Sequence, residues 1–170
     1  AGGLPLAALP GIAARMDGLY ELVAGALSSD PMRAQASGAE LGLDPARSYD
    51  SWQAMFAAEA GRADGIEAVA IVTPNHLHFP VARDALAAGL HVICDKPLTA
   101  TLAEAEALER LAAASGRVFA VTYNYSAYPM VRQARAIVAQ GAIGALRVVQ
   151  VEYAQDWLAG PLESEGQKQA

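Results

Sequence analysis

Short apolar runs alternate with longer segments of mixed polarity along most of this chain. The runs Ile66–Val72, Leu90–Cys94 and Val118–Thr122 contain few polar residues, which is typical of strands in a parallel sheet that is covered on both faces. An earlier run, Tyr20–Leu27, predicts a further strand. Because helical segments separate these runs, the sequence predicts an α/β fold built on a doubly wound parallel sheet.

The segments between the strands carry helix start and stop signals. Asp30 is an N-cap candidate, and Asn75 is expected to cap the helix that ends before Gly89. We expect helices over Leu6–Met16, Pro31–Leu41, Ser51–Gly61, Asn75–Ala88, Leu102–Ser115 and Met130–Gln140. The fifth of these helices is expected to be amphipathic, with a common apolar side formed by Leu102, Leu108 and Leu111.

The pattern changes after Gly144. Apolar residues recur closely in the strand-like run Leu146–Tyr153, and no helix follows it. We therefore expect a second, α+β domain to begin here. Residues 1–144 would form the first domain, and residues 145–170 would form the beginning of the second.

Charge and cysteine content narrow the range of partners. The net charge is −6, and the lysines and arginines are scattered singly, whereas nucleic acids and anionic membranes select clustered positive charge. A small-molecule partner is therefore expected. Cys94, the one cysteine, lies inside an apolar run, so we expect a packing residue in a reducing compartment rather than a catalytic thiol. The sequence has no membrane-span or leader pattern, which predicts a cytoplasmic protein.

Two polar turns follow neighbouring strands. The first is Thr73–Asn75, with His78 one helical turn later, and the second is Asp95–Pro97. Both turns follow the carboxyl ends of parallel strands, which is the edge where open α/β sheets bind ligands. Lys96 can present its ammonium group to a substrate hydroxyl or oxyanion, although a solvated turn lysine is the alternative. His76 and His78 do not predict a metal site, because no Cys, Asp or Glu ligands accompany them.

The two turns appear in the order T-P-N-x-x-H and D-K-P, one strand and helix apart. A Tyr123-Asn124 pair follows the next strand, and a G-A-I-G turn follows at Gly141–Gly144. Together these motifs resemble the Gfo/Idh/MocA family of NAD(P)-dependent oxidoreductases, over roughly residues 12–157. The resemblance implies a Rossmann-type domain that binds NAD or NADP. It also implies hydride transfer to or from a secondary alcohol or ketone, on a sugar, sugar derivative or inositol.

The resemblance also implies roles for single residues. Lys96 would be the catalytic residue, in contact with substrate and cofactor, and Asp95 would bind the nicotinamide ribose. Other residues expected to line the cofactor are Thr73, Pro74, Asn75, His78 and Asn124. Tyr123 would lie near the substrate. Packing for His78 and helix capping for Asn75 stay open as alternatives.

Ser28, Ser29 and Arg33 are further cofactor-binding candidates. They follow the predicted strand Tyr20–Leu27, where an acidic residue would bind the ribose of NAD and neutral or basic groups admit the 2′-phosphate of NADP. This favours NADP or dual use, unless Asp30 turns inward instead of capping its helix. Near the other end, Trp157 beside a carboxylate could form a platform for a sugar ring, and simple packing explains it equally well.

Two patterns of the family are incomplete in this sequence. Relatives carry a first strand with a complete G-x-G-x-x-G turn, and a carboxyl-terminal domain with a D-x-x-x-H pair. We therefore expect a fragment truncated at both ends, with strand edges left unpaired and unstable as an isolated monomer. The full-length protein is expected to be a homo-oligomer. The alternative function is a non-catalytic Rossmann-like remnant that acts as a binding or assembly module.

Overall fold

The computed structural model describes residue 13 and residues 16–154. The chain divides into two compact units, Ala1–Thr122 and Tyr123–Ala170. The domain boundary expected after residue 144 stays a prediction. Most of the expected helix Leu6–Met16, and Trp157, lie outside the described residues.

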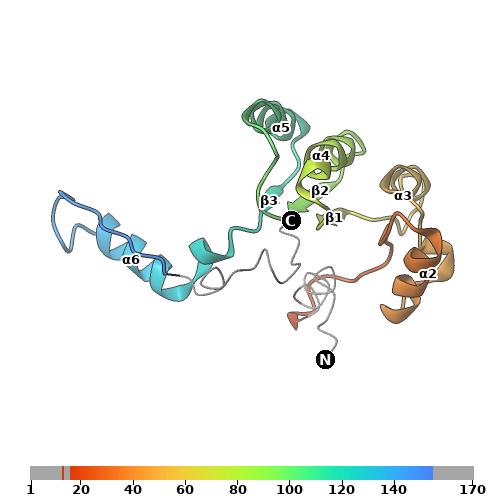
Figure 1. Cartoon of the computed structure of the whole chain (residues 1–170), viewed down its shortest axis with the longest axis horizontal. Helices are drawn as coiled ribbons and strands as arrows, with labels where there is room; N and C mark the ends of the chain where they lie inside the picture. Colours follow the sequence, from red (N-terminus) through yellow and green to blue (C-terminus); the bar gives the residue numbers. More distant parts are fainter. Residues whose placement is uncertain (1–12, 14–15, 155–170) are drawn as a thin grey trace, which may run out of the picture. The chain divides into compact units, whose positions relative to one another are not determined.

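The first unit is built on three parallel strands, β1 (Ala68–Ile71), β2 (His91–Cys94) and β3 (Phe119–Val121), in the order β1-β2-β3 (Figure 1). In the register of the sheet, Ile71 lies opposite Cys94, and Cys94 lies opposite Val121. The three apolar runs therefore form adjacent strands of one sheet. The predicted parallel α/β fold is confirmed.

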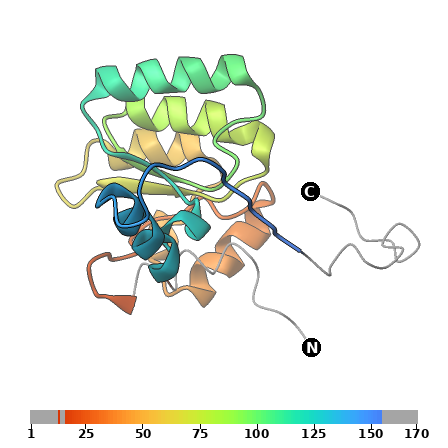
Figure 2. The ribbon, with the colours of Figure 1, turned by 90° about the vertical axis from the view of Figure 1, so that its left-hand side faces the viewer.

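Four α-helices accompany the strands of the first unit. They are α2 (Pro31–Glu40), α3 (Trp52–Glu59), α4 (His78–Ala87) and α5 (Leu102–Ser115). Helices α3, α4 and α5 lie along one side of the sheet (Figure 2). Short 3-10 turns cover η1 (Pro45–Arg47) and η2 (Asn75–Leu77). Each of the four α-helices falls inside a segment predicted to be helical, whereas η1 lies outside those segments.

The helix ends follow local capping chemistry, with one exception. Asp30 accepts a hydrogen bond from the backbone N–H of Arg33, so the predicted cap of α2 is confirmed. Gly89 ends α4 with φ near +76°, a conformation that glycine adopts at no steric cost. The predicted cap at Asn75 is wrong. Asn75 begins the η2 turn, and α4 begins at His78 without a side-chain cap.

The core lies between the sheet and α4. Val92 and Cys94 of β2 are completely buried, and Ala82 and Ala85 of α4 are also completely buried. On β1, Val69 and Ile71 are buried while Ala70 between them is exposed. The buried side chains of the strands thus belong to the face that α4 contacts, as the alternation along a strand requires.

Helix α5 contacts α4 along a narrow strip. Leu108 is 1% exposed and belongs to the core, but Leu102 is 75% exposed and Leu111 is also exposed. Of the three leucines expected on a common apolar side, only Leu108 is buried. Ala112, four residues later, is partly buried and packs against the same core.

The predicted strand Tyr20–Leu27 is reduced to a single bridge. Gly25 pairs with Ser48 in a parallel bridge, in which the Gly25 N–H donates to Arg47 (3.1 Å) and the Tyr49 N–H donates to Gly25 (2.8 Å). The prediction of a strand here is wrong. A strand needs a ladder of backbone partners, and the described residues supply partners only at this one point.

A buried ion pair anchors the segment that forms this bridge. Arg47 makes two hydrogen bonds to the Glu59 carboxylate of α3, and Tyr49 donates its hydroxyl to the same carboxylate at 2.8 Å. Glu59 is 2% exposed. Desolvation by burial raises the pKa of Glu59, but the hydrogen bonds from Arg47 and Tyr49 and the charge of Arg47 outweigh it, so the pKa lies below its usual value.

The second unit contains η3 (Asn124–Ala127) and α6 (Pro129–Ala139), and no described residue of either is buried. The predicted helix at Met130–Gln140 is confirmed. The predicted strand Leu146–Tyr153 is wrong, since these residues form no strand and lie exposed. Nothing among the described residues pairs with this run, although the Tyr153 hydroxyl contacts the Tyr125 hydroxyl at 2.9 Å.

The buried carboxylate makes stability dependent on pH. Because the pKa of Glu59 is lowered in the fold, its contribution is present above the unfolded value and is lost as pH falls through the lowered folded value. Glu59→Gln should reduce the free energy of unfolding at pH 7 by about 3 kcal/mol, as measured by urea denaturation. The control Arg83→Gln, which removes an ion pair to Asp84 on the surface, should change it by less than about 0.5 kcal/mol. Equal effects would contradict this account.

Gly38 on α2 lies so close to Ser48 that a side chain at this position would clash. A Cβ added there would lie 2.1 Å from Ser48 Oγ, a buried atom with no hydrogen-bond partner among the described residues. Gly38→Ala should therefore destabilise the fold by about 1–3 kcal/mol, despite the better helix propensity of alanine. Ser48→Ala alone should be neutral or stabilising, and it should reduce the cost of Gly38→Ala when the two are combined. Additive changes in a double-mutant cycle would refute the contact.

Candidate functional site

The two polar turns leave the sheet side by side. Ile71 and Cys94 are register partners at the ends of β1 and β2, and the Asp95 N–H donates to the Ile71 carbonyl at 2.9 Å. The turns Thr73–Asn75 and Asp95–Pro97 therefore begin at adjacent points on the carboxyl edge of the sheet. This is the placement that the sequence predicted for a ligand site.

Asp95 is held as a carboxylate by its neighbours. Its Oδ1 accepts hydrogen bonds from Thr122 Oγ1 (2.7 Å) and from the Lys96 N–H (2.8 Å). Desolvation raises the pKa of Asp95, but these hydrogen bonds and the charges of Lys96 and His78 outweigh that effect, so the pKa lies below its usual value. Asp95 Oδ2 has no hydrogen bond within the described residues, and this oxygen is available to a ligand.

Thr122 was missed by the sequence reasoning. It follows β3 as Asp95 follows β2, and its N–H donates to the Cys94 carbonyl at 3.0 Å. A polar residue at the end of an apolar run was the available signal. The same signal identified Thr73 and Asp95 on the other two strands.

Lys96 extends from the turn into solvent. It is exposed, and its ammonium group makes no ion pair within the described part of the chain. The following peptide bond to Pro97 is cis. The backbone on either side of Lys96 is hydrogen-bonded, at Asp95 and at the Pro97 carbonyl. The Lys96 side chain is thus without a partner in the described part of the chain, while the backbone on either side of it is held by hydrogen bonds.

The first turn presents hydroxyl and amide groups at the same edge. Thr73 Oγ1 is buried and has no hydrogen-bond partner among the described residues. Asn75 is exposed, and its side chain does not cap the helix. An orphaned hydroxyl beside a free amide suits a polar ligand that completes their hydrogen bonds.

His78 lies beneath both turns rather than on the surface. It is 1% exposed, and its ring contacts the Thr73 carbonyl and the Pro97 carbonyl. The packing alternative for His78 is therefore confirmed, while direct cofactor contact stays a prediction. Across residue 13 and residues 16–154, no three His, Cys, Asp or Glu side chains are grouped for a metal ion.

Ser28, Ser29 and Arg33 lie on a different segment, at the start of α2. Ser28 Oγ accepts from the Asp30 N–H at 3.1 Å, and Ser29 and Arg33 are exposed. Asp30 itself caps the helix, so the capping alternative for this residue is confirmed. Among the described residues, no hydrogen bond joins these side chains to the two turns.

Tyr123 and Asn124 begin the second unit. Tyr123 is exposed, and its carbonyl accepts from Ser126 Oγ at 2.6 Å. Asn124 is the first residue of η3 and is exposed. Their predicted contacts with substrate and cofactor stay predictions, as does that of Trp157, which lies outside the described residues.

Cys94 has no nucleophilic role at this edge. The side chain is completely buried, and burial, together with the charge of Asp95, raises the pKa of the thiol to about 11. The thiolate needed for nucleophilic chemistry is therefore scarce at neutral pH. The predicted packing role is confirmed.

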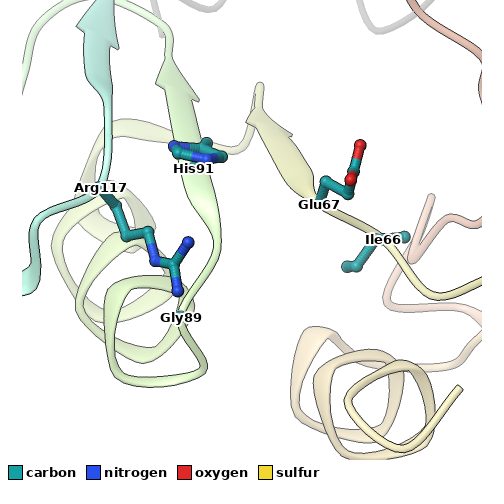
Figure 3. A pocket seen from close by; sticks show the side chains of 5 residues that line it. All are labelled: Ile66, Glu67, Gly89, His91 and Arg117. Carbon is teal, nitrogen blue, oxygen red and sulfur yellow. The ribbon is translucent and has the colours of Figure 1, made fainter. Parts of the chain in front are cut away.

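A cavity of about 320 Å³ lies at the opposite, amino edge of the sheet (Figure 3). Its lining consists of Ile66, Glu67, Gly89, His91 and Arg117. His91 Nδ1 accepts a hydrogen bond from the Val118 N–H at 2.9 Å, so that nitrogen is already occupied. None of the residues predicted to form the site lines this cavity.

No helix in the described part of the chain is long and apolar enough to cross a membrane.

Comparison with known proteins gives concordant matches. The family model GFO_IDH_MocA, described as an oxidoreductase family with an NAD-binding Rossmann fold, matches residues 8–123. An uncharacterized oxidoreductase of Bacillus subtilis is 44% identical over 149 residues, which are 88% of this chain and 37% of that protein.

Two solved structures are also similar. An oxidoreductase from Sinorhizobium meliloti is 59% identical with a TM-score of 0.85, over 89% of this chain and 42% of that one. An inositol dehydrogenase homolog from Azotobacter vinelandii, solved with NADH and myo-inositol, is 45% identical with a TM-score of 0.79, over 86% of this chain and 39% of that one. The chain thus spans about two fifths of the length of these relatives.

The hydrogen bond from Thr122 should be visible in the titration of Asp95. Thr122→Val removes a donor to the carboxylate, so the pKa of Asp95 should rise, which a carbonyl-detected NMR titration would measure. Thr99→Val is the matched control, because Thr99 Oγ1 donates to the Thr101 carbonyl instead. An unchanged Asp95 titration in Thr122→Val would show that the hydrogen bond does not stabilise the carboxylate.

Proposed function

The chain belongs to the Gfo/Idh/MocA family of oxidoreductases, with an NAD-binding Rossmann fold, and on that premise we propose the reaction of the whole protein. It transfers a hydride between NAD or NADP and a secondary alcohol or ketone of a sugar, sugar derivative or inositol. The observation that carries this proposal is the placement of Lys96 and Asp95 beside the Thr73 turn, at one edge of a parallel sheet.

The residues present fit a nicotinamide cofactor. Thr73 Oγ1 is a buried hydroxyl without a partner among the described residues, and Asn75 and Asp95 Oδ2 offer further polar groups for a ribose and amide. The cofactor supplies the hydride chemistry when it is bound. The chain itself contributes binding and orientation through the Thr73–Asn75 turn and Asp95.

Lys96 is the proposed catalytic residue. Its ammonium group is unpaired within the described residues and extends from a turn with fixed ends, so it can donate a hydrogen bond to the oxygen of the reacting carbon. As the alcohol is oxidised, its hydroxyl proton passes to water, and the Lys96 ammonium stabilises the alkoxide that is left at the reacting carbon. In the reverse direction the same ammonium stabilises the developing oxyanion.

Use of NADP as well as NAD is supported by the start of α2. Asp30 is engaged as a helix cap, while Ser29 and Arg33 are exposed. Neutral and basic groups at this point admit a 2′-phosphate, whereas a free acidic group would select the ribose hydroxyl of NAD. The proposal also includes substrate contacts of Tyr123 and Trp157 and a cofactor contact of Asn124. For the whole protein it includes assembly as a homo-oligomer and a cytoplasmic location.

The substrate class is supported by the chemistry of a relative. The inositol dehydrogenase homolog, 45% identical to this chain, was solved with myo-inositol. A ring that carries several hydroxyl groups offers acceptor oxygens to which the Lys96 ammonium can donate. We therefore place inositols and sugars ahead of simple alcohols.

A lysine variant tests the reaction in the intact protein. Lys96→Met should lower kcat for the oxidation of myo-inositol or a sugar by about 10²–10⁴-fold, with the NADH Kd changed by less than about threefold. The measurements are cofactor reduction at 340 nm and calorimetry with NADH and NADPH. Arg83→Gln, on the surface of α4, is the control and should retain full activity.

The outcomes separate the rival functions. Retained activity in Lys96→Met would remove the catalytic role of this lysine. Failure of the wild-type protein to bind either cofactor would overturn the oxidoreductase proposal and favour the binding or assembly module.

A further inference from the structure

His78 is a buried residue that touches both turns of the site. Its Nδ1 lies 2.6 Å from the Pro97 carbonyl oxygen, and its Nε2 lies 2.9 Å from the Thr73 carbonyl oxygen. The side chain is 1% exposed, so water does not compete for either nitrogen. The ring therefore bridges the backbone of the first turn and the backbone of the second.

Both partners of this ring are hydrogen-bond acceptors. A carbonyl oxygen only accepts, whereas a neutral imidazole has one N–H donor and one lone-pair nitrogen. In either neutral tautomer, one nitrogen would direct its lone pair at a carbonyl oxygen within hydrogen-bond distance, in a buried site. Both contacts are hydrogen bonds only when both nitrogens carry protons, which makes the ring an imidazolium cation.

The surroundings provide a counter-charge for this cation. Asp95 lies in the second turn as a carboxylate, whose pKa is held below its usual value by the hydrogen bonds from Thr122 and Lys96. Lys96 contributes a like charge from the same turn, but it is exposed to solvent. Cys94, which ends β2, stays a neutral thiol. The ring thus contacts the same turn that carries this carboxylate.

The ring also completes the fixation of the turn that carries Lys96. On one side of Lys96, Asp95 is tied to Ile71 through its N–H and to Thr122 through its carboxylate. On the other side, the Pro97 carbonyl is tied to His78. Leu98, the next residue, also packs against the core, but the ring is the contact that ties the Pro97 carbonyl to the first turn.

We propose that His78 is a positioning residue that, as an imidazolium cation, ties the Thr73 turn to the Pro97 turn and so holds Lys96 beside the cofactor-facing residues. The catalytic meaning of this tie rests on the proposed function. The two ring protons and the contacts of the ring with both turns do not depend on that proposed function. They are properties of the folded chain that exist with or without a bound cofactor.

Ring nitrogens report the protonation directly. In ¹⁵N-histidine-labelled protein at pH 7, the ring spectrum of His78 should show two N–H protons, both protected from exchange with solvent. His78→Gln assigns the signals by their loss, and His76→Gln, at an exposed position two residues earlier, should leave them unchanged. A ring with one N–H proton and one unprotonated nitrogen would overturn the proposal. This measurement uses the wild-type protein and does not depend on the stability of any variant.

Amide hydrogen exchange tests the tie. In His78→Gln, the amide of Leu77, which donates to Pro74 of the first turn, and the amide of Lys96 in the second turn should exchange about tenfold faster, as expected for the loss of a buried hydrogen bond. The Val92 amide, bonded to Val118 in the sheet, should be unchanged, and His76→Gln should alter none of the three. Unchanged exchange at Leu77 and Lys96 would refute the positioning role. If the intact protein shows no dehydrogenase activity, the proposed function fails while these two measurements still decide the state of His78.

Discussion

The parallel register of β1 and β2 is the constraint on which the rest of this structure depends. With Ile71 opposite Cys94, the two strands end together, and the turns that follow them share one edge. The same register directs Val92 and Cys94 towards α4, where both are completely buried. A slip of one residue would turn these side chains to the other face. Core packing and site geometry are therefore consequences of a single alignment.

Sequence reasoning succeeded where the signal was local. The apolar runs that became β1, β2 and β3, the cap at Asp30 and the stop at Gly89 depend on residues within a few positions of each other. It failed where a partner was needed. Tyr20–Leu27 and Leu146–Tyr153 have the composition of strands, but composition records burial potential and not the presence of a neighbouring strand.

The candidate site shows the same division. The turns at Thr73 and Asp95 could be predicted, because polar residues after apolar strands mark the ligand edge of such sheets. The contribution of Thr122 to Asp95, and the contacts of His78 with two carbonyls, join residues up to 27 positions apart. They depend on tertiary placement. Local sequence thus identified the groups offered to a ligand, while the fold determined which groups support them.

Because Cys94 is buried, the rate at which its thiol is modified can report local opening of the fold. The sulfhydryl is the single thiol of the chain, lies completely inside the layer between β2 and α4, and has a pKa of about 11. An alkylating reagent can reach it only after the structure around it opens, either at α4 or at the turn before Leu98. The rate of thiol modification therefore measures how often the layer beneath the site opens, and a ligand that closes the edge above Asp95 would make that modification slower.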